Sequence, residues 1–172
     1  GRMEHARRLV REGMEQGAIG LSTGMSYLSE VDQAIRVIHN AGCNQLVVLH
    51  CVSNYPTDPA DTNLCAMQTM ATAFGVPVGY SDHTQGIEVS LAAVAMGASV
   101  IEKHFTLDRS LPGPDHLASL EPADLVAMVR GIRNVEAALG HGRKEPAPSE
   151  ANSSQVIRRS LAAEVDMTEG TP

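Results

Sequence analysis

Short apolar runs alternate along this chain with amphipathic segments, and the alternation predicts four repeats of a strand followed by a helix. The strands are expected at 18–21, 45–50, 76–78 and 99–101, and the helices after them at 29–40, 64–74, 87–97 and 122–139. A charged amphipathic helix at 4–15 precedes the first strand. The run between Gln45 and His50 is apolar throughout, as is usual where helices cover a parallel sheet. The pattern therefore predicts an α/β fold.

Polar residues gather after each predicted strand rather than before it. They are Ser22 after the first strand, Ser53 and Tyr55 after the second, Ser81 and His83 after the third, and His104 after the fourth. Because parallel strands end at the same edge of a sheet, these side chains are expected on one rim. A closed barrel with such a rim takes eight repeats and about 250 residues. Four repeats predict a partial (β/α)8 TIM barrel of about four βα units.

His83 and His104 lie 21 residues apart, which is the length of one predicted repeat. Each has an acidic neighbour, Asp82 or Glu102, which could fix the tautomer of the imidazole. Neutral imidazoles suit Mn²⁺ or Zn²⁺. Two loop histidines are more often surface or hydrogen-bonded groups, so the pattern by itself leaves both interpretations open.

The three serines of the rim also allow two interpretations. Ser22, Ser53 and Ser81 could each cap the helix that follows, which is the simpler explanation for any one of them. Taken together, hydroxyls beside helix N-termini could instead hold a phosphate. Tyr55 could anchor its loop or face a ligand.

Composition narrows the class of protein. A formal charge of −7 and no basic run beyond Arg7-Arg8 and Arg158-Arg159 argue against a nucleic-acid partner. No apolar stretch approaches the ~20 residues of a membrane span, so no membrane partner is expected. Three cysteines without Cys-x-x-Cys spacing favour reduced thiols, and with them a cytoplasmic location.

Four motifs carry a specific resemblance, in their order and spacing. They are residues 51–57 (Cys-Val-Ser-Asn-Tyr-Pro-Thr), 79–84 (Gly-Tyr-Ser-Asp-His-Thr), 102–106 (Glu-Lys-His-Phe-Thr) and 113–116 (Gly-Pro-Asp-His). In these the chain resembles the sialic acid synthase (NeuB) family. The resemblance implies the C-terminal half of a TIM barrel at 21–140, a linker at 141–157, and the truncated start of an antifreeze-like (SAF) domain at 158–172.

The same resemblance implies an activity and a site. The family condenses phosphoenolpyruvate with an N-acyl mannosamine or a related N-acyl hexosamine to give a nonulosonic (sialic) acid, as a homodimer with a divalent metal. Mn²⁺ is the expected metal, with Mg²⁺ and Co²⁺ as alternatives. The resemblance implies that His83 and His104 bind the metal, that they act with Asp115 in catalysis, and that the three serines face phosphate. Tyr55 and Asp115 would face the sugar. The phosphate-binding lysines of the family's first strands have no counterpart here, so truncation is expected to cripple the activity.

Two other interpretations remain. Residues 3–24 resemble a D-aminoacylase-type amidohydrolase, which would make 1–20 a helix and strand lead-in from another family and the chain a possible metal-dependent amidohydrolase. No His-x-His motif follows. The other alternative is a non-catalytic fragment that self-associates through the open edges of its half sheet and leaves aliphatic residues such as Leu46–Leu49 exposed.

Overall fold

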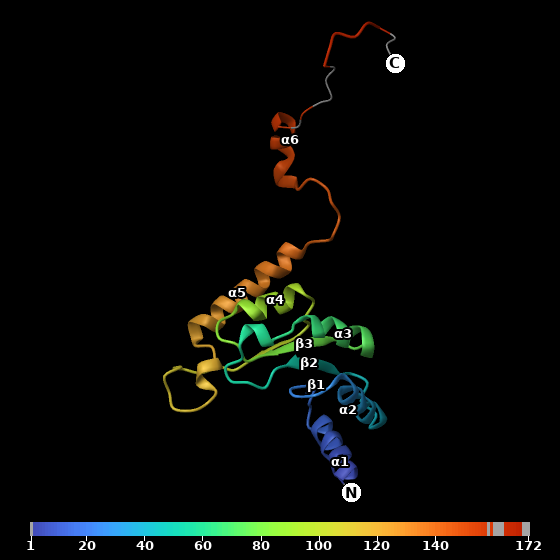
Figure 1. The fold of residues 1–172 in the computed structure, drawn as a ribbon, viewed down its shortest axis with the longest axis vertical. Helices are drawn as coiled ribbons and strands as arrows, with labels where there is room; N and C mark the ends of the chain where they lie inside the picture. The colour runs from blue at the N-terminus through green and yellow to red at the C-terminus, as the bar shows by residue number, and fades with distance from the viewer. Residues whose placement is uncertain (1, 158, 160–163, 170–172) are drawn as a thin grey trace. The chain divides into compact units, whose positions relative to one another are not determined.

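The computed structural model describes residues 2–157, 159 and 164–169, and the chain divides into two units, 1–140 and 141–172. Figure 1 shows the order of the elements along the chain. The first unit contains α1 (Arg2–Glu15), β1 (Gly20–Ser22), α2 (Leu28–Asn40), β2 (Val47–Cys51), α3 (Cys65–Phe74), β3 (Val78–Asp82), α4 (Glu88–Ala95), β4 (Ile101–Lys103) and α5 (Pro122–Leu139). Short 3-10 turns lie at Pro59–Asp61 and His116–Ala118.

The strands form one four-stranded sheet in the order β1-β2-β3-β4, and every neighbouring pair is parallel. Each strand is followed by a helix, so the predicted repeats are confirmed as half of a βα barrel. The edge strands β1 and β4 each have one neighbouring strand and are three residues long. Two edges of the sheet are therefore open, as expected for four strands of an eight-stranded barrel.

The sequence pattern places the last two strands too early, and it makes the third strand too short. The prediction ended them at Val78 and Ile101, but β3 continues to Asp82 and β4 to Lys103. All five residues of β3 are buried, including its polar ones. The polar residues interrupt the apolar run, which is a pattern typical of a loop. In the sheet they alternate between two faces, and each face supplies partners for them.

The apolar core lies between the sheet and helices α2, α3 and α4. Val48 and Val78 point toward these helices, and so do their neighbours in strand register. They pack with Val31 and Ile35 of α2 and with Met70 of α3. We call this helix-covered side the outer face of the sheet, and the opposite side, which corresponds to the interior of a barrel, the inner face.

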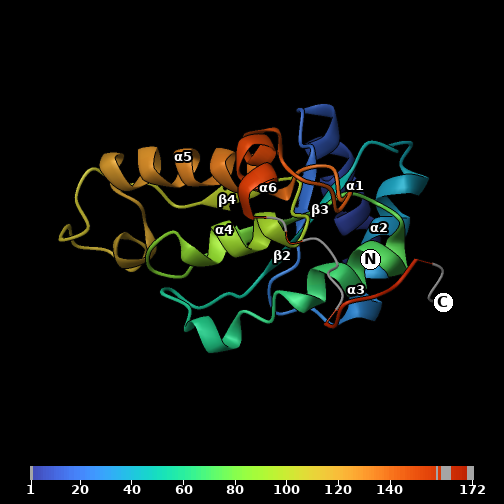
Figure 2. The ribbon, with the colours of Figure 1, turned by 90° about the horizontal axis from the view of Figure 1, so that it is seen from above.

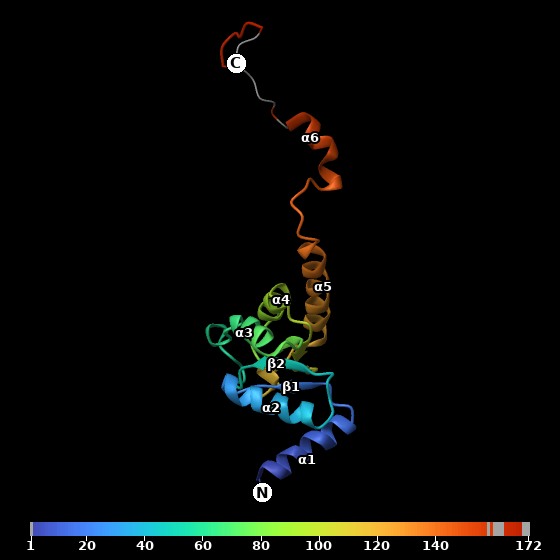
Figure 3. The same ribbon diagram turned by 90° about the vertical axis from the view of Figure 1, so that its right-hand side faces the viewer.

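Two further helices pack against this layer. Helix α1 contacts α2, and α5 lies along α4 (Figures 2 and 3). Gly131 brings α5 close to α4, because a Cβ atom at this position would lie 2.9 Å from Leu91 Cδ2. Helix α5 thus extends the helical layer next to α4.

The aliphatic run 46–49 is covered, so the prediction that it would be exposed was wrong. Val48 is fully buried on the outer face, and Leu49 is 7% exposed on the inner face. The Leu49 side chain lies over Gly79, where a Cβ atom would come within 2.6 Å of Leu49 Cδ2. On the inner face, Leu49 is therefore buried by folding over a glycine of the neighbouring strand.

The second unit contains a 3-10 turn (Pro148–Glu150) and the short helix α6 (Ala151–Ile157), inside the segment predicted as a linker. Glu150 starts this turn by accepting a hydrogen bond from the Ala147 amide at 2.7 Å. Most of the predicted SAF segment 158–172 lies outside the described residues, and its described part, 159 and 164–169, contains no helix or strand. Within the described part of the chain, none of the helices has the length and apolarity that crossing a membrane requires.

Candidate functional site

Three rings meet where the strands end at their carboxyl edge. Tyr55 comes from the loop after β2, His83 follows β3, and His104 follows β4. The ring centroids of Tyr55 and His83 are 4.1 Å apart, those of Tyr55 and His104 5.5 Å, and those of His83 and His104 5.1 Å. The predicted grouping of these residues on one rim is thus what the structure shows.

The His83 ring is oriented by a backbone carbonyl rather than by a carboxylate. Its Nδ1 lies 2.8 Å from the Val52 carbonyl oxygen and 3.7 Å from Cys51 Sγ. Because a carbonyl oxygen only accepts, Nδ1 carries a proton, and in the neutral form of the ring the lone pair is on Nε2. The expectation that Asp82 fixes this tautomer was wrong, because the Asp82 side chain points to the outer face, where it bonds Ser90 of α4.

His104 and Asp115 are brought together by a closed loop. Backbone hydrogen bonds from Leu120 N to His104 O and from Thr106 N to Leu120 O close residues 107–119 at their base. Within this loop Asp115 Oδ2 lies 4.0 Å from His104 Nδ1, and both side chains are partly exposed. The acid is therefore beside the imidazole, and it can bond either the ring or a ligand.

The predicted serines do not cap helices. The residues at the N-caps are Tyr27 for α2, Leu64 for α3 and Ile87 for α4. Ser22 is an exposed residue at the end of β1. Ser53 is half-buried and lies against the loop after β1, where a Cβ atom at Gly24 would come within 2.1 Å of Ser53 Oγ.

Ser81 is buried on the inner face and donates a 2.7 Å hydrogen bond to Glu102 Oε1. Glu102 is paired with Ser81 across the β3–β4 ladder, so both side chains project to the inner face. Sequence reasoning noticed Glu102 only as a neighbour of the histidine. The spacing could have revealed its place, because Ser81 and Glu102 are separated by the same 21 residues as the two histidines.

The Tyr55 hydroxyl is affected by several of the acidic groups around the site. Partial burial, followed by the negative fields of Cys51, Asp115 and Glu102, raises the pKa of Tyr55. Its hydroxyl consequently stays protonated over the physiological range and can donate to a ligand. His50, in contrast, lies on the outer face, where its Nε2 is 2.8 Å from the Thr62 carbonyl oxygen and its ring is near Tyr80.

The donors suit a metal that keeps much of its hydration. Among the described residues there is no group of three His, Cys, Asp or Glu side chains placed to hold an ion. Two imidazoles 5.1 Å apart, one with a free Nε2, can supply part of a coordination shell. A structural zinc site uses four protein ligands, whereas hard divalent ions often keep several waters and take further oxygens from substrate.

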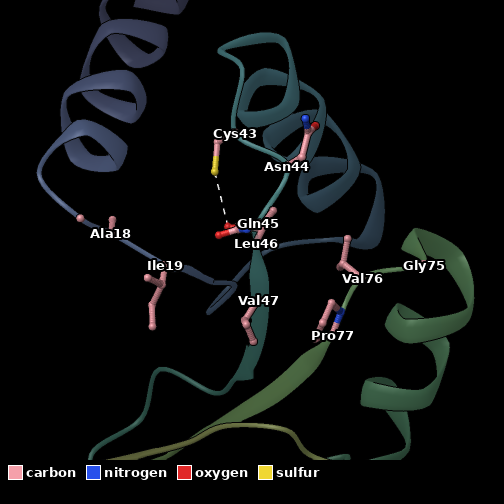
Figure 4. Close-up of a pocket in the computed structure, with 11 residues that line it drawn as sticks. Ala18, Ile19, Cys43, Asn44, Gln45, Leu46, Val47, Gly75, Val76 and Pro77 are labelled. Carbon is pink, nitrogen blue, oxygen red and sulfur yellow. Dashed lines mark hydrogen bonds between the residues drawn. The ribbon is translucent and has the colours of Figure 1, made fainter.

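The opposite end of the sheet holds a groove of different character. Its volume is about 650 Å³, and it is lined by residues that precede or begin β1, β2 and β3 (Figure 4). The one hydrogen bond drawn there joins Cys43 Sγ to the Gln45 carbonyl oxygen at 3.4 Å. No acidic or basic side chain is found among the described residues that line it. In βα barrels this end serves stability rather than chemistry.

Comparison with known proteins shows the family of the chain. The sequence profile of the NeuB family matches residues 3–144, a range that includes the segment resembling an amidohydrolase. The chain is 51% identical over 154 residues to the N,N'-diacetyllegionaminic acid synthase of Legionella pneumophila, which covers 87% of this chain and 43% of that protein. It is 40% identical over 152 residues to human N-acetylneuraminate-9-phosphate synthase, covering 88% and 42%.

A solved structure of a related synthetase is similar to this chain in fold as well as in sequence. The fold matches an N-acetylneuraminic acid (sialic acid) synthetase from Leptospira borgpetersenii serovar Hardjo-bovis in complex with citrate, with a TM-score of 0.75 and 39% identity, over 89% of this chain and 55% of that one. The chain spans less than half the length of the two curated relatives, 43% and 42%. The profile match over most of its residues, with relatives of this similarity, shows that the chain belongs to the NeuB family.

Proposed function

We propose that the rim site takes part in a nonulosonic acid synthase reaction, in which phosphoenolpyruvate condenses with an N-acyl mannosamine or related sugar. The observation that carries the proposal is the cluster of Tyr55, His83 and His104 at the carboxyl edge of the sheet. Edges of this kind hold the active sites of βα barrels. The names of the relatives, which are synthases of legionaminic and neuraminic acids, support the choice of reaction.

His83 and His104 would hold one divalent cation, Mn²⁺ in the first instance and Mg²⁺ or Co²⁺ as alternatives. The free Nε2 of His83 supports this role, because the Val52 carbonyl holds the ring proton on Nδ1. When bound, such a cation supplies Lewis-acid polarisation of the aldehyde of the open-chain sugar.

The remaining side chains bind and orient the substrates. Tyr55 donates from its protonated hydroxyl, and Asp115 accepts from a sugar hydroxyl. The serines at 22, 53 and 81 would face the phosphate. Ser22 and Ser53 can donate to its oxygens, whereas Ser81 already donates its one hydroxyl hydrogen to Glu102. Carbon 3 of phosphoenolpyruvate forms the new bond to the aldehyde carbon, water adds at carbon 2, and phosphate then leaves. Glu102, bonded by Ser81, is positioned to exchange protons on the inner face.

Assembly belongs to the same proposal. Strands β1 and β4 leave two parallel edges open, and a barrel closes only with further strands. The 172-residue chain alone would meet this need with a second copy related by a two-fold axis. Sedimentation at micromolar concentration should show a dimer, and a compact monomer that unfolds cooperatively would contradict this part.

The metal assignment is tested by titrating the chain with Mn²⁺ and following bound ion by electron paramagnetic resonance. His83→Ala and His104→Ala should each abolish saturable binding. His39→Ala is the matched control, because this exposed histidine lies in the last turn of α2, away from the rim. Equal binding by the His104→Ala variant and the parent chain would reject the proposed ligands.

The reaction is tested in a chimera. Residues 21–140 replace the matching segment of the Legionella pneumophila relative, and turnover is measured with that enzyme's own substrates. We expect measurable turnover that is lost on His104→Ala. The 172-residue chain alone should turn over phosphoenolpyruvate and N-acetylmannosamine little or not at all, because it provides four strands of an eight-stranded barrel. An inactive chimera that folds would contradict the proposed reaction.

A further inference from the structure

A buried ion pair lies directly behind the two histidines. Asp82 and Lys103 are the last residues of β3 and β4 and face each other in the ladder. Lys103 Nζ lies 3.1 Å from Asp82 Oδ2, and the two side chains are 3% and 0% exposed. Because side chains alternate along a strand, the pair occupies the outer face, while the residue that follows each member is a histidine of the rim.

The carboxylate of Asp82 is fully engaged. Its Oδ1 accepts from the amide and the hydroxyl of Thr84, each at 2.8 Å. Its Oδ2 accepts from Ser90 Oγ at 2.6 Å and from Lys103. Four donors, from Thr84 after β3, Ser90 of α4 and Lys103 of β4, therefore converge on one buried group and fix its position.

Lys103 completes a frame around the His83 backbone. Its ammonium group also donates to the Thr84 carbonyl oxygen. Thr84 is thus bound through its amide by Asp82 and through its carbonyl by Lys103, and His83 is the residue between Asp82 and Thr84. The His83 carbonyl oxygen is itself held by the Thr57 amide at 2.8 Å. Little freedom remains in the backbone that carries this imidazole.

A buried ion pair is not the most stabilising way to fill this space. Burial lowers the pKa of Lys103, and the charge and hydrogen bond of Asp82 oppose that shift without cancelling it. Apolar residues of similar volume often replace a buried ion pair at no loss of stability. Directional bonds to Thr84 and across the ladder, in contrast, set the relative positions of two strand ends, which apolar packing does not do.

We infer that Asp82 and Lys103 are positioning residues, which hold His83 and His104 at the separation that lets both rings face one ligand. They act from the dry face of the sheet and touch no substrate. The metal-binding consequence rests on the proposed function, whereas the effect on the ring arrangement does not.

The test compares the whole 172-residue chain with the double variant Asp82→Asn/Lys103→Met, which removes both charges at nearly constant volume. Asp82→Asn alone is the second variant, and it carries the test if the double variant does not fold. Ser99→Ala is the matched control. It removes a 2.8 Å bond to the Val78 carbonyl oxygen at the other end of the same strand pair.

Two measurements distinguish a change in the arrangement of the two rings from loss of folding and from a change in metal binding. In metal-free protein with ¹³C-labelled histidine, nuclear Overhauser effects between the His83 and His104 ring protons report the 5.1 Å centroid distance. Mn²⁺ titration then reports affinity, which falls about 10–100-fold when groups that orient metal ligands are lost. We expect the double variant to lose the ring contacts and this affinity while helix content stays unchanged, and Ser99→Ala to keep both.

Retained ring contacts and unchanged Mn²⁺ affinity in a folded double variant would overturn the inference. The same loss in Ser99→Ala would also overturn it, because any weakening of the strand pair would then suffice. If the parent chain binds no Mn²⁺ but the variant still loses the ring contacts, the proposed metal site fails and the positioning role stands.

Discussion

The two faces of the sheet use polar residues in opposite ways. On the outer face Asp82 and Lys103 are buried and paired with each other, and Ser90 of α4 also bonds Asp82. On the inner face and its rim, Glu102 and His104 are partly or largely open, and each has bonding capacity left for a ligand. Adjacent residues of the same strands thus serve both functions, because successive side chains point in opposite directions.

The polar groups of the outer face contribute to stability, whereas those of the inner face remain available to bind a ligand. A buried group with all its partners contributes to the free energy of unfolding and is expensive to disturb. An open group with spare lone pairs contributes little to stability and can be altered at low cost to the fold. Outer-face substitutions should therefore lower stability more than chemically equivalent changes on the inner face.

The largest effect is expected for Lys103→Met alone. This change leaves the Asp82 carboxylate buried with no cationic partner, which costs about 3–5 kcal/mol in the free energy of unfolding. The measurement is urea unfolding followed by circular dichroism. Adding Asp82→Asn should recover much of the loss, because the unpaired charge is then removed. A single variant as stable as the parent would show that the carboxylate finds another partner or takes up a proton.

The same substitution on both faces sharpens the contrast. Ser90→Ala removes a donor to the buried Asp82, and hydrogen bonds to charged groups are worth about 1.5–3 kcal/mol. Ser81→Ala removes the corresponding donor to Glu102, whose side chain is open to solvent, and should cost less than ~1 kcal/mol. Both are measured by urea unfolding. Equal losses would mean that the faces do not differ in this way.

On the inner face, Gly79→Ala should lower the free energy of unfolding by less than the Lys103→Met change, because it disturbs packing and leaves no charge unpaired. In Gly79→Ala the new methyl group would lie 2.4 Å from the Val100 carbonyl oxygen and 2.6 Å from Leu49 Cδ2. Overpacking of this kind costs about 1–3 kcal/mol. Leu49→Ala in the same background should relieve part of the clash, so the two changes should be non-additive in unfolding experiments. Simple additivity would place Leu49 away from the glycine.

Periodicity predicted most of the fold and the outline of the site. The apolar runs and helical stripes were sufficient for β2, α2 and the order of elements, and one repeat length brought His83 and His104 together. The ends of β3 and β4 were missed because Ser81 and Asp82 look like loop residues until their partners are known. Several contacts of this site join residues that are far apart in the sequence and leave no local pattern. Ser81 bonds Glu102, Asp82 pairs with Lys103, and the Val52 carbonyl orients His83.

A small gain in stability, rather than a loss, is expected from Tyr80→Phe on the outer face. The Tyr80 ring is fully buried, and within the described part of the chain its hydroxyl has no hydrogen-bond partner. Burial raises the pKa of Tyr80, so the group is neutral and its cost is the lost hydration of one hydroxyl. Phenylalanine fills the same space without that cost and should stabilise the chain by about 1 kcal/mol, or roughly 2–4 °C in Tm. Calorimetry measures the shift. A lower Tm would reveal a bound water or another partner for the hydroxyl, and the outer face would then hold one more satisfied polar group.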